Sequence, residues 1–251
     1  RACRRSGADQ GREAAASLAL SAARHGLAGL LLTAALALGL DRSLDLGEGY
    51  VAKALAAYTV VVLVLAQFLS LHLPHGRLGP ANQVTLTRAV LVCLLAALLG
   101  EGASPALAWA ALGLALVAEG LDGLDGHLAR RWGWSSPFGA RFDMEVDALL
   151  VAVLAMVLWS HGRAGAWVLA AGLLRFLFVA AGALWPWAAR PLPPSRRRQT
   201  ICVIQVLTLT LALAPIIPPD RGALLAATGL ASLCYSFAVD GLWLVRRARL
   251  E

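Results

Sequence analysis

Residues 122–147 read DGLDGHLARRWGWSSPFGARFDMEVD and contain four aspartates in two pairs. Asp122 and Asp125 are three residues apart, and Asp143 and Asp147 are four apart, so each pair shares one face of a helix. Four carboxylates this close together repel one another unless cations neutralise them. Because the surrounding sequence is apolar, that repulsion is costlier still, and an ionisable cluster in such surroundings predicts a functional site.

The composition around this stretch predicts an integral membrane protein. Of 251 residues, 59% are hydrophobic and 15% charged, whereas a soluble domain carries about 25% charged residues. The apolar residues form repeated runs of about 20, the length of helix that crosses a bilayer. The net charge of +7 comes almost wholly from arginines between these runs. Their position favours membrane headgroups over nucleic acid as the partner.

We expect an all-α fold, a polytopic bundle of membrane helices. Arginines concentrate in alternate loops, and the opposite loops carry only Arg42, Arg163 and Arg221. This positive-inside bias predicts that both termini lie in the cytoplasm. The eight expected spans are residues 18–40, 51–72, 84–100, 105–123, 139–160, 164–185, 199–217 and 222–245.

This topology predicts that both aspartate pairs lie at the cytoplasmic surface. The first pair ends the fourth span and the second pair begins the fifth. Residues 126–137 are expected to form a cytoplasmic linker, and Ser135-Ser136-Pro137 is typical of a helix start.

The residue types in this stretch indicate the chemistry of the site. Carboxylates without histidine or cysteine at ligand spacing favour Mg²⁺ or Mn²⁺ over zinc. Such ions usually complete their coordination with substrate phosphates, which implies a phosphorylated substrate. Gly126 and Gly139 allow a ligand or a facing helix to approach the backbone. Arg130 is suited to bind phosphate charge.

The stretch resembles the signature of the class I CDP-alcohol phosphotransferase family, DxxDGxxAR, then eight residues, then GxxxDxxxD. The matching residues are Asp122, Asp125, Gly126, Ala129, Arg130, Gly139, Asp143 and Asp147. Upstream, Asn82, Thr85 and Arg88 resemble the Asn-x-x-Thr-x-x-Arg pattern of the family's first core helix. The resemblance implies a six-helix core at residues 80–251. Residues 1–79 would then add a cytoplasmic tail and two accessory membrane helices.

The resemblance also implies a reaction, in which a CDP-alcohol donates its phosphoalcohol to a second alcohol and CMP is released. Asp122, Asp125 and Asp143 would hold one divalent ion, and Asp122, Asp143 and Asp147 a second, with Asp147 also the base for the incoming hydroxyl. The family further suggests a homodimer. The implied CDP-binding residues are Gly126, Ala129, Arg130, Gly139, Asn82, Thr85 and Arg88.

Two further arginines are candidates for binding the acceptor or headgroup. Arg175 lies in the middle of an expected span, where an arginine is costly. It either binds a headgroup phosphate or pairs with a carboxylate, and Arg141 on the motif helix has the same two alternatives.

The leading hypothesis is an enzyme of phospholipid biosynthesis in the bacterial cytoplasmic membrane, with CDP-diacylglycerol as donor and a small polar alcohol as acceptor. A second subtype stays open, because Arg131, Ser135-Ser136-Pro137 and Phe142 also resemble choline and ethanolamine phosphotransferases, which use diacylglycerol as acceptor. From other classes, an intramembrane prenyltransferase would separate its aspartate motifs more widely. A divalent-cation transporter would place its carboxylates near the bilayer midplane.

Overall fold

The computed structural model describes residues 7–69, 77–132, 136–185, 187, 190 and 192–248. Within these ranges, the side chains of residues 7–12, 14 and 124–132 are not described.

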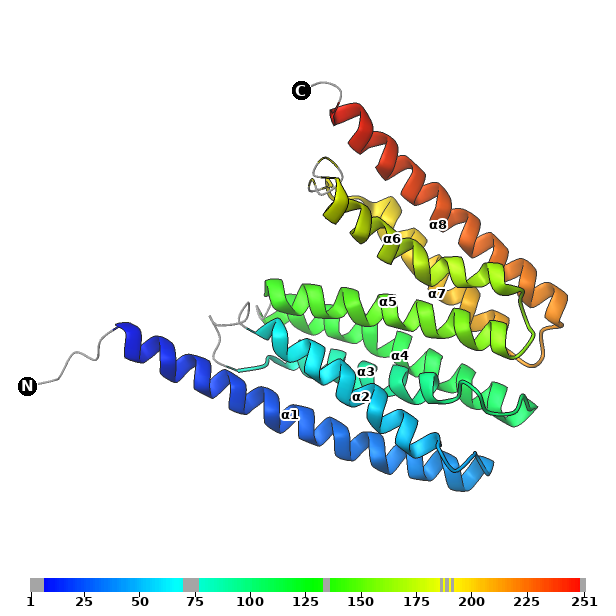
Figure 1. Ribbon diagram of the computed structural model, residues 1–251, viewed down its shortest axis with the longest axis horizontal. Coiled ribbons are helices and arrows are strands. Elements are labelled where there is room, and N and C mark those ends of the chain that lie inside the picture. The colour runs from blue at the N-terminus through cyan, green and yellow to red at the C-terminus, as the bar shows by residue number, and fades with distance from the viewer. Residues whose placement is uncertain are drawn as a thin grey trace, which may run out of the picture. The chain divides into compact units, whose positions relative to one another are not determined.

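The described part of the chain is helical and contains no strand, which confirms the all-α prediction. Helices lie at all eight expected positions (Figure 1). In chain order they are α1 (Gly7–Leu44), α2 (Tyr50–Gln67), α3 (Pro80–Ala97), α4 (Pro105–Trp132), α5 (Pro137–Ser160), the 3-10 helix η2 (Ala166–Leu169), α6 (Ala170–Leu184), α7 (Arg196–Leu213) and α8 (Pro219–Ala248).

Six of these helical segments are long and apolar enough to cross a membrane, so the chain is an integral membrane protein. The predicted spans at α5 and α7 are not among the six. Both begin with charged residues: α5 carries Arg141, Asp143, Glu145 and Asp147 in its first half, and α7 opens on three arginines. Charge at one end lowers the apolar character of a helix without shortening it.

The predicted linker at residues 126–137 is shorter than expected. Helix α4 continues to Trp132, nine residues beyond the predicted end of its span at residue 123. Residues 124–132 contain no proline to break the helix. An apolar run therefore marks where a helix leaves hydrocarbon and not where the helix itself ends. The helix start predicted at residues 135–137 is confirmed, because α5 begins at Pro137 and Gly139 N donates to Ser136 Oγ at 3.0 Å.

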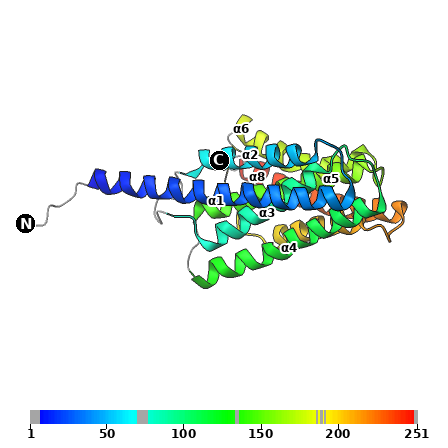
Figure 2. The ribbon, with the colours of Figure 1, turned by 90° about the horizontal axis from the view of Figure 1, so that it is seen from below.

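The chain divides into two compact units: unit 1 is residues 1–101 and 114–147, and unit 2 is residues 102–113 and 148–251. In unit 1, α1, α2 and α3 pack against one another (Figures 1 and 2). Of the six candidate spans α3 is the most buried, with 67% of its window buried against 33% or less for the others. The predicted boundary between residues 79 and 80 stays a prediction.

Polar contacts attach α2 to the far end of α3. Tyr50 Oη donates to the carbonyl of Leu94 at 3.2 Å. Lys53 Nζ donates to the carbonyl of Leu99 at 2.9 Å and to Glu101 Oε1 at 2.6 Å. The second oxygen of Glu101 accepts from Gly47 N at 2.8 Å, so one carboxylate joins the α1–α2 turn, α2 and the end of α3.

In unit 2, α7 and α8 pack along their length, and small residues allow the close approach. A Cβ added at Gly229 would lie 2.2 Å from Thr208 Oγ1. Arg163 holds the α7–α8 turn by donating to the carbonyls of Ala212, Ala214 and Ile217 at 2.7–2.8 Å. Arg197 Nη2 pairs with Asp240 of α8 at 2.6 Å.

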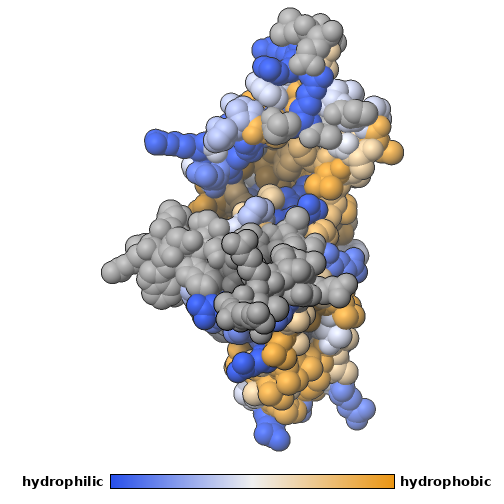
Figure 3. Space-filling view, turned by 90° about the vertical axis from the view of Figure 1, so that its left-hand side faces the viewer, coloured by the Kyte–Doolittle hydropathy of each residue, from blue (hydrophilic) through white to orange (hydrophobic). Residues whose placement is uncertain are grey.

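The outer surfaces of the helices are apolar, as a lipid environment requires. Figure 3 shows hydrophobic side chains gathered over α1 and α2 in the lower part of the view. Their exposed residues include Leu20, Leu27, Leu31, Val60 and Leu63. Large apolar residues that face outward on long helices have bilayer hydrocarbon as their partner.

Replacing Gly172 with alanine should destabilise unit 2. A Cβ at this position would lie 2.8 Å from Ala152 Cα, a backbone atom that cannot move without shifting α5. We expect a loss of about 1–2 kcal/mol, since overpacking exceeds the gain in helix propensity. The matched control is Gly113→Ala, where nothing lies within 4 Å of the added Cβ. Thermal unfolding in detergent measures both, and an equal melting temperature for the two variants would contradict the prediction.

Acid should weaken the polar contacts that Glu101 makes between α2 and the end of α3. Hydrogen bonds from Lys53 and from Gly47 N hold the pKa of Glu101 below its usual range. A carboxylate whose pKa is lowered by folding stabilises the fold above its unfolded pKa, about 4.3, and loses that contribution as the pH falls through its folded pKa. The melting temperature of the wild type should therefore fall more steeply below about pH 5 than that of Glu101→Gln. Parallel curves would show that this carboxylate contributes nothing.

Candidate metal centre

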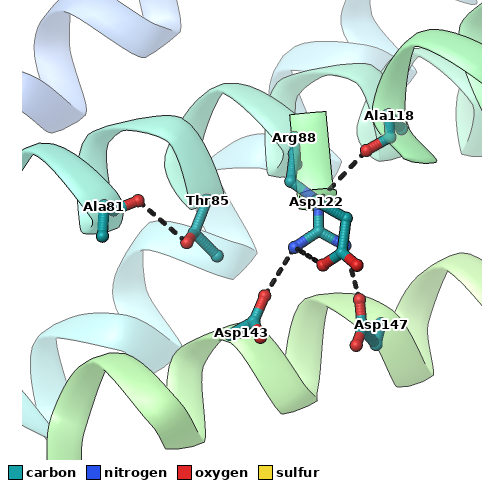
Figure 4. A network of polar contacts seen from close by, with 7 residues as sticks. All are labelled: Ala81, Thr85, Arg88, Ala118, Asp122, Asp143 and Asp147. Carbon is teal, nitrogen blue, oxygen red and sulfur yellow. Dashed lines mark hydrogen bonds and ion pairs between the residues drawn. The ribbon is translucent and has the colours of Figure 1, made fainter. Parts of the chain in front are cut away.

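The candidate site is a cluster of three aspartates in unit 1, contributed by two helices. Asp122 comes from α4, and Asp143 and Asp147 come from one face of α5. One oxygen of each carboxylate lies within 4.8 Å of the others. Tertiary structure thus brings together members of both predicted aspartate pairs (Figure 4).

Arg88 of α3 lies at the centre of this cluster. Its Nη1 is 2.7 Å from Asp122 Oδ1 and 2.5 Å from Asp143 Oδ1, and its Nη2 is 2.5 Å from Asp147 Oδ1. Its Nε donates to the carbonyl of Ala118 on α4 at 3.2 Å. The guanidinium therefore joins α3, α4 and α5 (Figure 4).

The two sides of the cluster differ in exposure. The Arg88 side chain is 1% exposed, whereas Asp122, Asp143 and Asp147 are 43%, 39% and 30% exposed. A buried cation thus closes one side of the cluster, and the carboxylates are accessible on the other. A ligand from solution can reach the aspartates without displacing the core of the unit.

Charge balance favours a further cation. Three carboxylates and one guanidinium leave a net charge of −2. At 4.8 Å, two like charges in an effective dielectric of about 20 repel by about 3.5 kcal/mol. Arg88 contacts one oxygen of each carboxylate, so each retains a second oxygen. An accessible all-oxygen donor set with excess negative charge fits Mg²⁺ or Mn²⁺.

Three residues of α3, Asn82, Thr85 and Arg88, form a polar stripe that faces α5. Asn82 and Thr85 are each 3% exposed, and they precede Arg88 at intervals of three residues. A Cβ added at Gly139 would lie 2.6 Å from Asn82 Oδ1, so the absent side chain admits the amide. Thr85 Oγ1 donates to the carbonyl of Ala81 at 3.1 Å (Figure 4).

The remaining residues predicted for the site stay predictions. The backbone of Asp125, Gly126, Ala129 and Arg130 belongs to α4, and the described part of the chain includes nothing further of these four residues. Arg141 stacks its guanidinium over Phe68, 4.8 Å from the ring centroid. Arg175 lies on α6 in unit 2.

The sequence did not indicate that Arg88 would contact the aspartates. We expected it beside CDP, on the resemblance alone. One signal was available, since an arginine inside an apolar run requires carboxylate partners and the chain offers few. The same argument does not reveal which aspartates those partners are.

A comparison with protein-family models finds a match to the CDP-alcohol phosphatidyltransferase family over residues 78–238. The matched region begins at the residue before Gly79, the N-cap of α3, and includes Arg88 and all three clustered aspartates. No curated protein and no solved structure matches the chain.

Replacing Arg88 with glutamine should destabilise the metal-free protein by about 3 kcal/mol, because three carboxylates lose their buried counter-ion. Added Mg²⁺ should then raise the melting temperature of the variant more than that of the wild type, since the ion replaces part of the lost charge. Thermal unfolding in EDTA and in excess Mg²⁺ measures both effects. Arg141→Gln is the control, because this arginine contacts a ring and not the cluster. Equal melting temperatures in EDTA for the two variants would contradict the counter-ion role.

Proposed function

Because the chain belongs to the CDP-alcohol phosphatidyltransferase family, we propose that it transfers a phosphatidyl group from CDP-diacylglycerol to a small polar alcohol. Members of this family are membrane-embedded transferases that use a CDP-alcohol and an alcohol. The observation that carries the proposal is the convergence of Asp122, Asp143 and Asp147, on the accessible side of Arg88, within the matched region.

The proposed reaction exchanges the phosphoanhydride bond of the donor for a phosphoester bond to the acceptor. The acceptor hydroxyl attacks the phosphorus that carries the diacylglycerol, and the bond from this phosphorus to the bridging oxygen breaks. CMP leaves with the bonding electrons. Divalent ions bound at the aspartates would neutralise the charge on the attacking and leaving oxygens.

The chain's own residues would position and deprotonate the reactants. Asp122, Asp125, Asp143 and Asp147 would hold the ions, and Asp147 would accept the proton of the incoming hydroxyl. Arg88 fixes one oxygen of Asp147 and leaves the other for this task. Its bonds to Asp122 and Asp143 keep these ligands in place between turnovers, so less reorganisation is needed when the donor binds.

The polar stripe on α3 supports a donor site beside the ions. Asn82 reaches across to α5 at Gly139, one turn before Asp143. We propose that Asn82, Thr85 and Gly139 line the CDP site together with Gly126, Ala129 and Arg130. Arg88 is placed to act on the aspartates and through them on the diphosphate. Arg141 and Arg175 are retained as proposed acceptor residues.

The donor and acceptor define two alternatives within the family. CDP-diacylglycerol with a small polar alcohol is the leading pair, and CDP-choline or CDP-ethanolamine with diacylglycerol is the second. The family match favours both over a prenyltransferase or a cation transporter. A homodimer, an active site facing the cytoplasm and a bacterial cytoplasmic membrane remain proposals.

The decisive experiment measures CMP release by purified protein in detergent. Each donor is combined with a panel of acceptors, in Mg²⁺, in Mn²⁺ and in EDTA. We expect CMP from CDP-diacylglycerol with at least one polar alcohol, and none in EDTA. Metal-dependent CMP release from only a CDP-aminoalcohol and diacylglycerol would select the second alternative, and no release from any pair would refute the proposal.

The role of the cluster is tested by Asp143→Asn. Loss of a metal ligand should reduce CMP release by more than the roughly 10–100-fold that an outer-shell partner costs. Glu145→Gln is the matched control, since Glu145 is an exposed residue on the same helix and loses the same charge. Comparable activity of the two variants would place the chemistry elsewhere.

A further inference from the structure

The guanidinium of Arg88 is fixed in place independently of the aspartates. Its side chain is 1% exposed, and the three residues that follow it on α3, Ala89, Val90 and Leu91, are also buried. Its Nε donates to the carbonyl of Ala118, a bond that involves none of the carboxylates. Separating a buried charge from its partners is strongly destabilising. Arg88 is therefore expected to keep its position when a divalent ion binds at the aspartates.

This fixed cation contacts the same carboxylates that would hold an ion. Its Nη1 lies 2.7 Å from Asp122 Oδ1 and 2.5 Å from Asp143 Oδ1, and its Nη2 lies 2.5 Å from Asp147 Oδ1 (Figure 4). An ion bound by these carboxylates would share each of them with the guanidinium. Like charges a few ångströms apart repel, and the repulsion is stronger where water is excluded. Arg88 therefore lowers the affinity of the cluster for a cation.

The direction of this effect does not depend on which other charges surround the cluster. Coulomb energies add pair by pair, so the repulsion between Arg88 and an ion is a separate contribution. Further charged groups change the total affinity for the ion. They do not change the sign of the shift that Arg88 causes.

The same guanidinium attracts an anion that approaches the aspartates. The three carboxylates are 30–43% exposed, and Arg88 contacts them from the buried side. The proposed donor carries a diphosphate, which would reach the cluster from the exposed side. Charges that are partly buried are screened much less than charges in solution. Arg88 therefore raises the affinity for the diphosphate while it lowers the affinity for the ions.

We propose that Arg88 is a positioning residue that keeps divalent ions weakly bound until the anionic donor binds with them. The proposal rests on the proposed function, because it takes the donor to be a diphosphate. Between turnovers Arg88 is the counter-ion of the aspartates, and the ions are held firmly only together with the donor. This role explains why a site of metal-binding carboxylates includes a buried arginine, which is costly within an apolar bundle.

The first test measures Mn²⁺ binding to the full-length protein in detergent, without nucleotide, by electron paramagnetic resonance of the free ion. We expect Arg88→Gln to bind Mn²⁺ about 10-fold more tightly than the wild type, because one nearby positive charge is removed. Arg88→Lys keeps the charge and should bind as the wild type does. Arg42→Gln, in the last turn of α1, loses the same charge elsewhere and is the control. Equal or weaker binding by Arg88→Gln would overturn the proposal.

The second test measures binding of cytidine diphosphate by calorimetry, at a saturating concentration of Mn²⁺. Here Arg88→Gln should bind more weakly than the wild type, which is opposite to its effect on the ion. A purely structural role of Arg88 would weaken the binding of both ligands, and that result would overturn the proposal. If neither protein binds cytidine diphosphate, the proposed function fails, and the Mn²⁺ measurement still decides how Arg88 acts on the ions.

The Asp122→Asn background gives a second comparison in case Arg88→Gln alone does not fold. With one carboxylate fewer, the cluster needs its counter-ion less, so the double variant should be more stable than Arg88→Gln. Adding Arg88→Gln to this background should again tighten Mn²⁺ binding and weaken binding of cytidine diphosphate. Shifts of the same sign for both ligands would overturn the proposal.

Discussion

A guanidinium held among three carboxylates is the interaction on which unit 1 depends. Arg88 is 1% exposed in the middle of α3, and an arginine there without partners would be too costly to bury. Asp122, Asp143 and Asp147 would repel one another without it. The guanidinium and the three carboxylates therefore stabilise one another, and the contacts between them fix how α3, α4 and α5 pack. A site built this way is ordered before any ion or substrate binds.

Helix α3 contacts the helices that carry the aspartates and also α1 and α2, which precede the region matched by the family model. One side of α3 carries Asn82, Thr85 and Arg88 toward the motif helices, and α1 and α2 also pack against α3. Contacts from Tyr50 and Lys53 hold α2 to the end of α3 remote from Asn82. The polar contacts of α2 with α3 thus lie away from the aspartate cluster.

The sequence predicted the helices well because bilayer thickness imposes a run length that composition reveals directly. The candidate span in α4 has the predicted bounds, Pro105–Gly123, but the helix itself continues to Trp132, because helical hydrogen bonding does not stop where apolar residues do. It placed the start of α5 correctly, because Ser136 and Pro137 act through local geometry. Signals from neighbouring residues, such as the helix start at Ser136 and Pro137, were therefore reliable. Among the signals about what surrounds a helix, only those for the lipid bilayer were reliable.

The sequence by itself determined that Asp143 and Asp147 share a helix face, since the spacing of four residues and the helical repeat suffice for that. The resemblance led us to expect Asp122 beside them, but only the tertiary structure decided that Arg88 is the common partner of all three. Arg88 is separated from Asp143 and Asp147 by 55 and 59 residues. Helical periodicity is encoded within one segment, whereas the pairing of faces from distant helices depends on packing between them, which no spacing along the chain records.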